Sequence, residues 1–305
     1  TGLSGFYRHG QVFLTWNNAG NSNNFYKAYR SLSPIVHGTQ LGNCEYLGWT
    51  NQLSAKDNDL SLHYHSTFYQ RIDSAGTPLS SSKGLFVATT LADGNYYYAI
   101  TVILNGAEDT TIIAGTNSTV QAISEQVSEP QPVFQQILII GGKSIESYSN
   151  FMSFKKNISQ PPILAAGWMA SDFLVYRNGN TGNQPLAMQW HGNGSDYFNN
   201  IENTASNEMN LNIEEFFPSG DHAGYWGANS TFNIFKDETS SPTTGINYNF
   251  FQELYLRTLN WAIRNLNIDS NRIYIQGSSA GACGAMNFSL TYPDKIAAVS
   301  VSVPC

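Results

Sequence analysis

Residues 277–281, Gly-Ser-Ser-Ala-Gly, have the types and spacing of a serine nucleophile held on a sharp turn. Ser279 is the central residue of this G-x-S-x-G pattern. A serine on a strained strand-to-helix turn needs very small neighbours two residues away on each side, because larger side chains would push the helix into the strand. Gly277 and Gly281 meet that requirement. In a chain rich in glycine and serine the pattern also arises by chance, so its flanking segments decide its meaning.

Those flanking segments predict the elements that must position Ser279. Residues 249–266 carry apolar side chains at helical spacing, namely Phe250, Leu254, Leu259, Trp261, Ile263 and Leu266. The apolar run 273–275 predicts a strand that leads into the turn. A second helix is expected directly after the turn, and the apolar run 296–299 predicts the next strand. Strand, turn, helix and strand in this order are the context in which the pattern marks a nucleophile.

The segment 272–281, followed by Gly284-Ala285-Met286 and by 292–299, resembles α/β-hydrolases of the secreted esterase, feruloyl-esterase and polyhydroxyalkanoate-depolymerase branch. The resemblance covers roughly the last 120 residues. It implies a doubly wound, mostly parallel sheet, a carboxylic ester as substrate, and no metal or organic cofactor. One departure is visible, because Ala282 and Cys283 separate the turn from Gly-Ala-Met and leave the start of the helix open.

The same resemblance implies an oxyanion hole. The tetrahedral oxyanion formed by serine attack needs hydrogen-bond donors. The sequence His191-Gly192-Asn193-Gly194 follows the apolar run 186–190, where esterases of this fold place an H-G-x-G loop. We expect donors from the amide of Ala280 and from the amide of Gly192 or Asn193. An ordinary glycine-rich turn is the alternative.

The base and the acid of a catalytic triad are not found after Ser279. In α/β-hydrolases the chain order is serine, acid, histidine, and no histidine follows Ser279 in the sequence. We therefore expect both residues to lie beyond residue 305, so that the chain is a truncated hydrolase domain, inactive by itself. His191, Asp221 and His222 precede the serine. Because convergent triads occur in other orders, an upstream histidine remains the alternative.

Aromatic residues between the two motifs are candidates for substrate binding. Tyr225 and Trp226 follow a strand expected at 211–218, and loops after the strands of an open α/β sheet form the cleft. Their flat rings suit a sugar or an aromatic ester, although core packing is an equal alternative. His191 is assigned to the same part of the site as a residue that shapes its loop.

The first 128 residues predict a separate all-β domain. Short alternating segments are separated by Gly, Asn and Asp turns, without a helical period, which is typical of an antiparallel, immunoglobulin-like sandwich. The segment 91–102 resembles the tyrosine-corner turn of fibronectin type III modules, with Trp16 as the early core tryptophan and Tyr96 or Tyr97 as the corner residue. The segment 37–83 is long for such a module, so we expect an insertion there.

The segment 125–132 contains two prolines and is expected to be a linker. The incomplete α/β-hydrolase domain would then occupy 129–305, with its first strands at 137–140, 163–166 and 173–176. The chain is accordingly predicted to be a multidomain protein, with no catalytic role for the sandwich.

Composition limits the partners and the compartment. The 305 residues include 12% charged residues and have a net charge of −7, with no cluster of Lys and Arg, which argues against nucleic acid. No apolar run approaches the length that crosses a bilayer. High Asn, Ser, Gly and Tyr content is common in secreted proteins. Because the chain begins Thr1-Gly2-Leu3, without an initiator Met or a signal peptide, we expect a processed product or an excised fragment.

Histidine and cysteine do not predict a metal site. His63 and His65 lie two residues apart on an expected strand, but no third ligand of suitable type is near, so we expect solvent-exposed polar residues. Three cysteines, Cys44, Cys283 and Cys305, cannot all pair within the chain. Cys283 is expected to be a small buried thiol in the helix after the turn.

Two functions remain open. The first is a secreted serine esterase that cleaves polyester, feruloyl or acetyl esters, with polymeric and carbohydrate-linked esters among its expected substrates; a serine peptidase of the same fold is an alternative. The second is an adhesion or carbohydrate-binding protein whose hydrolase-like domain has no chemistry.

Overall fold

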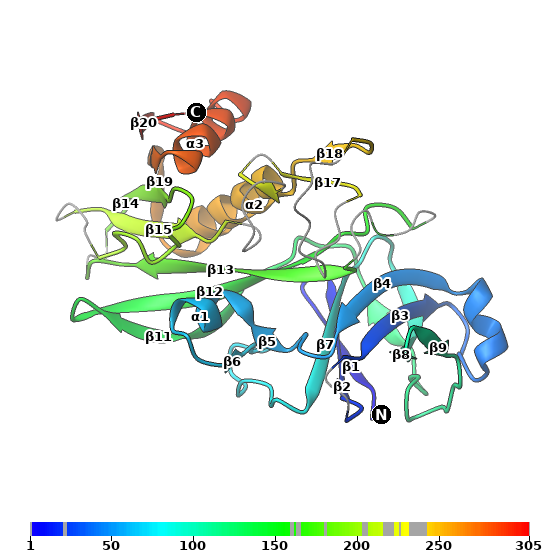
Figure 1. Cartoon of the computed structure of the whole chain (residues 1–305). Coiled ribbons are helices and arrows are strands. Elements are labelled where there is room, and N and C mark those ends of the chain that lie inside the picture. Colours follow the sequence, from blue (N-terminus) through cyan, green and yellow to red (C-terminus); the bar gives the residue numbers. More distant parts are fainter. Residues whose placement is uncertain are drawn as a thin grey trace.

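The computed structural model describes all residues except 1, 21–22, 159–161, 163–165, 180–181, 203–206, 216–222, 226, 232–242 and 305. Two small antiparallel sheets form the N-terminal part, and a larger sheet flanked by helices forms the C-terminal part (Figure 1). No helix among the described residues is long and apolar enough to span a membrane.

The N-terminal part is an antiparallel sandwich. One sheet has the order β1 (Ser4–Arg8), β2 (Gln11–Asn17), β7 (Lys83–Thr89). The other has the order β10 (Ile123–Glu125), β8 (Gly94–Leu104), β3 (Phe25–Ser31), β4 (Glu45–Asn51), and β9 (Ala107–Asp109) also pairs with β8. Val12, Leu14 and Trp16 pack with Tyr98 and Ile100 of the facing sheet. The expected sandwich is therefore present, while its assignment to immunoglobulin-like or fibronectin type III modules stays a prediction.

Strand β2 is buried on both faces. Its outward residue Phe13 meets Phe151 edge to face, with 5.2 Å between ring centroids, and Gln11 Nε2 donates to the carbonyl of Phe151 at 2.9 Å. Phe151 belongs to the C-terminal sheet. The sandwich is therefore packed directly against that sheet.

The expected insertion contains a helix. A 3₁₀ helix at Gly38–Asn43 precedes β4, and β5 (Lys56–Asp57), α1 (Asn58–His63) and β6 (Phe68–Tyr69) follow it. The carboxylate of Asp57 caps α1 by accepting from the amide of Leu60 at 2.9 Å. The expectation of a purely β N-terminal part is thus wrong, because a six-residue helix is too short to produce a sequence repeat.

The connection between the two parts begins after Glu125. Glu125 is buried in the sandwich, where its carboxylate binds the guanidinium of Arg30 at 3.1 Å and the hydroxyl of Thr90 at 2.9 Å. This corrects the expected linker 125–132, whose first residue belongs to β10. Division of the chain into folding units 1–128 and 129–305 stays a prediction.

The C-terminal sheet has seven strands. In spatial order they are β11 (Val133–Ile140), β12 (Lys143–Ser153), β13 (Trp168–Tyr176), β15 (Met209–Ile213), β14 (Gln184–Trp190), β19 (Ile268–Ser278) and β20 (Ala298–Ser302). The pairings from β11 to β15 are antiparallel, whereas β15, β14, β19 and β20 pair in parallel. The sheet is therefore mixed, which corrects the expectation of a mostly parallel one.

Two helices complete this part, α2 (Phe250–Asn265) and α3 (Ala280–Thr291). A small sheet of β16 (Ala223–Gly224), β17 (Gly227–Asn229) and β18 (Asn247–Tyr248) lies before α2. Helix α2 confirms the pattern seen at 249–266, and Asn249 caps it by accepting from the amide of Gln252. The strand expected at 163–166 falls largely outside the described residues.

Different elements pack on the two faces of the C-terminal sheet. Phe173 and Val175 of β13 pack in the main core with side chains of α2 and α3, such as Leu254 and Phe288. Leu174 points to the opposite face, where a smaller cluster contains Leu60 of α1. Helix α1 of the N-terminal insertion therefore covers the face of the C-terminal sheet that α2 and α3 leave open (Figure 1).

Candidate functional site

Ser279 lies on a strained turn between β19 and α3. Its backbone angles are φ 53° and ψ −123°, a conformation that costs a residue with a side chain about 1–3 kcal/mol. Helix α3 begins at the next residue, so Ala282 and Cys283 lie inside it. The expected order of strand, turn, helix and strand is confirmed. The catalytic role of Ser279 stays a prediction.

Gly277 and Gly281 make this turn possible. A β-carbon on Gly277 would lie 2.4 Å from the carbonyl oxygen of Gly281, and one on Gly281 would lie 2.2 Å from the carbonyl oxygen of Trp190. Both atoms are backbone atoms and cannot move aside cheaply. The two glycines therefore allow α3 to pack against its own strand and against the end of β14.

The loop 191–194 lies beside Ser279. Strand β14 pairs in parallel with β19, with Trp190 opposite Gly277, so both strands deliver their next residues to the same end of the sheet. A β-carbon on Gly192 would lie 3.1 Å from the β-carbon of Ser279. The structure thus brings together the two motifs that the sequence singled out.

Three amide groups near Ser279 are candidates for binding an oxyanion. The amide of Ala280 is the first of α3, and the first amides of a helix have no carbonyl partner within it. Among the described residues, no carbonyl accepts a backbone hydrogen bond from Gly192 or Asn193. Asn193 is exposed. These are the amides that the sequence predicts as the oxyanion hole.

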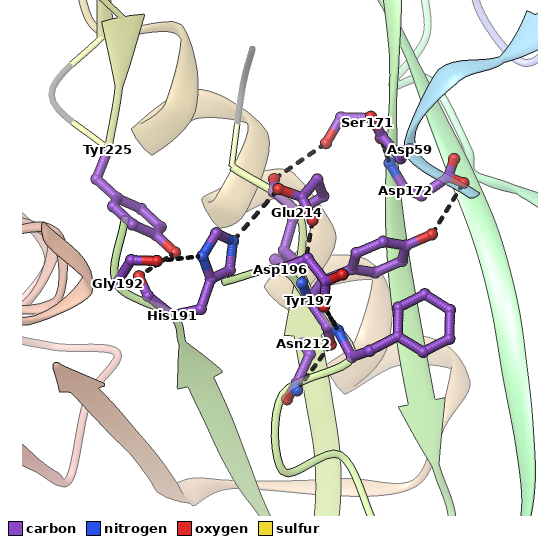
Figure 2. Close-up of polar contacts among 12 residues, drawn as sticks. Asp59, Ser171, Asp172, His191, Gly192, Asp196, Tyr197, Asn212, Glu214 and Tyr225 are labelled. Atoms are coloured by element: carbon purple, nitrogen blue, oxygen red, sulfur yellow. Dashed lines mark hydrogen bonds and ion pairs between the residues drawn. The ribbon is translucent and has the colours of Figure 1, made fainter. Parts of the chain in front are cut away.

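His191 is buried at the start of the loop and has an oxygen atom within 3.3 Å of each ring nitrogen. Nδ1 lies 3.1 Å from the carbonyl oxygen of Gly192, and Nε2 lies 3.3 Å from Oε1 of Glu214 (Figure 2). Burial lowers the pKa of His191, but the hydrogen bond and the charge of Glu214 together outweigh it and raise the pKa above its usual value. With 4% of its surface exposed, His191 is placed to support the loop, as expected from the sequence, and its assignment to substrate binding stays a prediction.

Tyr225 belongs to the core. It is 1% exposed, its ring stacks on Trp190 with 5.2 Å between centroids, and its hydroxyl donates to the carbonyl of His191 at 3.0 Å (Figure 2). This burial favours the core-packing alternative for Tyr225, and its role in substrate binding stays a prediction. Trp226, Asp221 and His222 lie outside the described residues.

A cluster of carboxylates stands behind the loop and was not found from the sequence. Asp172 of β13 receives the hydroxyl of Ser149 at 2.5 Å, and its amide donates to Asp59 at 2.9 Å. Glu214 accepts from the amide of Tyr197 at 3.0 Å (Figure 2). The sequence offers one signal for this cluster, the adjacent pair Glu214 and Glu215 directly after a short apolar strand. The other carboxylates of the cluster come from distant segments of the chain.

Burial shifts the acids of this region toward their neutral forms. It raises the pKa of Asp57 to about 6 and that of Glu215 to about 7. Burial and the charges of neighbouring carboxylates raise the pKa values of Asp59 and Asp172 as well. For Glu215, burial raises the pKa more than the attraction of His191 lowers it.

His63 is not an exposed residue of a strand. It lies in α1, where Nδ1 is 2.5 Å from Asp196 Oδ2 and the ring stacks on Phe198 with 3.4 Å between centroids. Only His65 is exposed. Among the described residues no group of His, Cys, Asp and Glu is arranged to hold a metal ion.

Cys283 is disulfide-bonded, which corrects its expected state as a buried thiol. Among the cysteines that the structure describes, Cys44 is the free one. The disulfide at Cys283 restrains the first turn of α3, which lies next to Ser279.

A cleft of about 990 Å³ opens where the N-terminal insertion meets the C-terminal sheet. One wall contains residues 50–70, and the other contains Asn193, Gly194 and Asp196 of the loop, with Glu214 and Glu215 after β15. The floor includes Trp168 of β13. The cleft therefore reaches the loop that contacts Ser279.

No protein-family model and no curated protein matches the chain. Among solved structures, the chain is similar to an acetyl xylan esterase from Aspergillus awamori, with 14% identity over 51% of this chain and 52% of that one and a TM-score of 0.33. It is also similar to an S-formylglutathione hydrolase from Agrobacterium tumefaciens, with 16% identity over 56% and 61% and a TM-score of 0.37. A carboxylesterase from Mesorhizobium loti gives 16% identity over 44% and 61%, with a TM-score of 0.34.

The chain thus spans between 52% and 61% of the length of these three proteins. The similar structures are esterases and hydrolases, at a similarity too low to assign the chain to a family.

Proposed function

We propose that the protein belongs to the α/β-hydrolase esterases and that Ser279 is the nucleophile of a carboxylic ester hydrolysis. One observation carries the proposal: the residue at the strained turn, with φ 53°, is a serine, and Gly192 of a neighbouring strand's loop lies against it. A strained serine between strand and helix, facing loop amides, is the arrangement that serine hydrolases of this fold use.

The proposed reaction has two steps. The Ser279 oxygen attacks the ester carbonyl carbon, its proton passes to a base, and the carbonyl oxygen becomes an oxyanion held by the amides of Ala280 and of Gly192 or Asn193. Collapse of this intermediate expels the alcohol and leaves an acyl group on Ser279. Water then attacks the acyl group and releases the acid. No metal is required, since the amides supply the electrostatic stabilisation.

The base is not supplied by a described histidine near Ser279. Both ring nitrogens of His191 face other groups, and His63 is paired with Asp196. No histidine follows Ser279 in the sequence, although the proposed fold places its base there. We therefore propose that the base and the acid come from outside the residues that the structure describes, and that the described residues alone do not complete the triad.

We further propose that the protein is secreted and acts on polymeric or carbohydrate-linked esters. The disulfide at Cys283 supports an oxidising compartment, where such bonds persist. The size and polarity of the cleft beside the loop support a bulky substrate.

Labelling with a fluorophosphonate tests the nucleophile. The reagent is to be incubated with the 305-residue chain and with a chain extended to the end of its reading frame, and the adduct located by mass spectrometry. The proposal expects an adduct on Ser279 in the extended chain, none in Ser279→Ala, and undiminished labelling in Ser278→Ala, the adjacent exposed serine. A folded extended chain without an adduct on Ser279 would reject it.

A non-catalytic binding protein is the second candidate, favoured by the lack of any histidine after Ser279 in the sequence. The same experiment separates the two, because only an activated serine reacts with the fluorophosphonate. Turnover of a p-nitrophenyl ester by the 305-residue chain, abolished in His191→Ala, would instead make the upstream histidine the base.

A further inference from the structure

The cleft beside the loop 191–194 joins residues from both halves of the chain. Its described lining includes side chains of the N-terminal insertion, such as Asn51, Asn58 and Gln70, and side chains of the C-terminal sheet. Residues 57–63 pack on the C-terminal sheet through α1, so this wall of the cleft is held in place by buried apolar contacts. A site at this position is absent from either half alone.

The contact between His63 and Asp196 holds the two walls together. His63 belongs to α1, and Asp196 lies four residues beyond Gly192 in the loop of the candidate oxyanion hole. The 2.5 Å contact between them and the stacking of His63 on Phe198 fix the width of the cleft where it meets that loop.

The lining of the cleft has the chemistry of a site for hydroxyl groups. Its neutral polar members can both donate and accept hydrogen bonds; they include Thr50, Asn51, Ser54, Asn58, Ser61 and Gln70. The indole of Trp168 adds an aromatic surface. Four carboxylates, those of Asp59, Asp196, Glu214 and Glu215, share the lining with a single lysine, Lys56, so an anionic ligand is disfavoured.

Two buried atoms in the cleft wall have no hydrogen-bond partner. Oε1 of Gln70, a residue 1% exposed, accepts no hydrogen bond, and Nε1 of Trp168, a residue 6% exposed, donates none. An unpaired buried polar atom costs about 1–3 kcal/mol. One needs a donor and the other an acceptor. A protonated amine supplies only donors and a carboxylate only acceptors, whereas a hydroxyl group supplies both, and it reaches these shielded atoms once the two side chains turn toward the cleft.

We propose that this cleft binds a neutral, polyhydroxylated ligand, a carbohydrate chain, and that residues of the N-terminal insertion supply half of the binding site. The assignment of the carbohydrate as the part of the substrate that carries the ester rests on the proposed function. Binding of a hydroxyl-rich ligand in the cleft does not depend on the proposed function. The sandwich half of the chain, which the sequence predicted to lack a role in the active site, is thereby a determinant of specificity.

Binding of neutral oligosaccharides tests this proposal without any ester. Cellohexaose, xylohexaose, mannohexaose and maltohexaose are to be added separately to the 305-residue chain and followed by saturation-transfer NMR, with spermidine and hexagalacturonate as the cationic and anionic probes. Dissociation constants of the probes that bind are then measured by calorimetry. We expect at least one neutral hexaose to bind and hexagalacturonate not to bind.

Two sets of variants locate the site. Trp168→Phe removes the unpaired N–H and keeps a ring, and the pair Asn58→Ala with His65→Ala removes exposed side chains of the insertion. Each is expected to raise the dissociation constant about tenfold, the effect of about one hydrogen bond. The control Trp16→Phe, a buried indole of the sandwich core, should leave binding unchanged. Thermal unfolding of each variant shows whether it folds.

Several outcomes would overturn the proposal. They are a folded chain that transfers no saturation to any neutral hexaose, binding of spermidine in preference to all of them, and exposed-residue variants that bind as tightly as the Trp16→Phe control. Failure of fluorophosphonate labelling together with intact hexaose binding would reject ester hydrolysis and leave the carbohydrate site standing.

Discussion

Gly192 and Ser279 are in contact across two parallel strands, since a β-carbon on Gly192 would lie 3.1 Å from that of Ser279 and 3.1 Å from the carbonyl oxygen of Ser278. The space between the two motifs is thus just sufficient for a hydrogen atom on Gly192. Any group added there must move the loop or the turn by a few tenths of an ångström.

Gly192→Ala is therefore expected to move the loop amides away from Ser279. The free energy of unfolding should fall by about 1 kcal/mol, the lower end of overpacking costs. Labelling of Ser279 in the extended chain should slow at least tenfold, because oxyanion donors act only when correctly placed. The rate of labelling and urea unfolding are the measurements. Gly42→Ala, at a site with open space, is the control, and equal labelling by both variants would contradict the prediction.

Ser279→Gly is expected to stabilise the protein. The positive φ of Ser279 costs about 1–3 kcal/mol, and glycine removes that strain at an unfolded-state cost of about 0.4–1 kcal/mol. A net gain of about 1 kcal/mol should appear in urea unfolding. Ser279→Ala keeps the β-carbon and the strain, so it should unfold like the parent chain. If both substitutions change stability equally, the strain is not at this residue.

Tyr225→Phe tests the core position of Tyr225. It keeps the stacking on Trp190 but removes the hydroxyl that donates to the carbonyl of His191. The loss of a buried hydrogen bond should lower the free energy of unfolding by about 1–2 kcal/mol. Hexaose binding should not change, because Tyr225 does not line the cleft. Weaker sugar binding at unchanged stability would support the substrate-contact interpretation.

The carboxylate cluster predicts that stability falls as pH rises. A carboxyl group whose pKa is higher in the folded chain binds more protons there, so its stabilisation is present at low pH and lost as pH rises through the folded pKa. For Asp57 and Glu215 those values are about 6 and about 7, and the raised pKa of His191 acts in the same direction. The unfolding midpoint should therefore decrease from about pH 5 to about pH 8.

The neutral variant Glu215→Gln should make that decrease smaller, mainly between about pH 5 and about pH 7, where burial keeps Glu215 protonated in the folded chain but not in the unfolded one. Asp109→Asn is the control. The pKa of Asp109 is lowered by its hydrogen bond from the amide of Thr111, so this residue contributes nothing between pH 5 and 8. Thermal unfolding across the pH range provides the measurement, and identical profiles for the two variants would contradict the assignment to Glu215.

The local features of the site were predictable from the sequence. The turn at Ser279 requires glycines two residues away on each side, and Asn249 caps α2 from within its own turn. Such features depend on steric and hydrogen-bonding requirements between residues a few positions apart. These requirements can be read directly from the amino-acid sequence. The placement of loop 191–194 beside Ser279 followed because parallel strands deliver their loops to one end of a sheet. Strand β12 was missed, since serines interrupt its apolar alternation.

Other features depended on the tertiary structure. His63 and Asp196 are 133 residues apart, and their contact exists because α1 covers a sheet face that α2 and α3 leave exposed. Tyr225 has the same sequence signal as a cleft residue and as a core residue, and only packing against Trp190 favours the core position. The sequence by itself thus determined the serine turn, its glycines and its neighbouring loop. Which distant surfaces meet, and so what surrounds that turn, was decided by the burial of apolar faces in the folded chain.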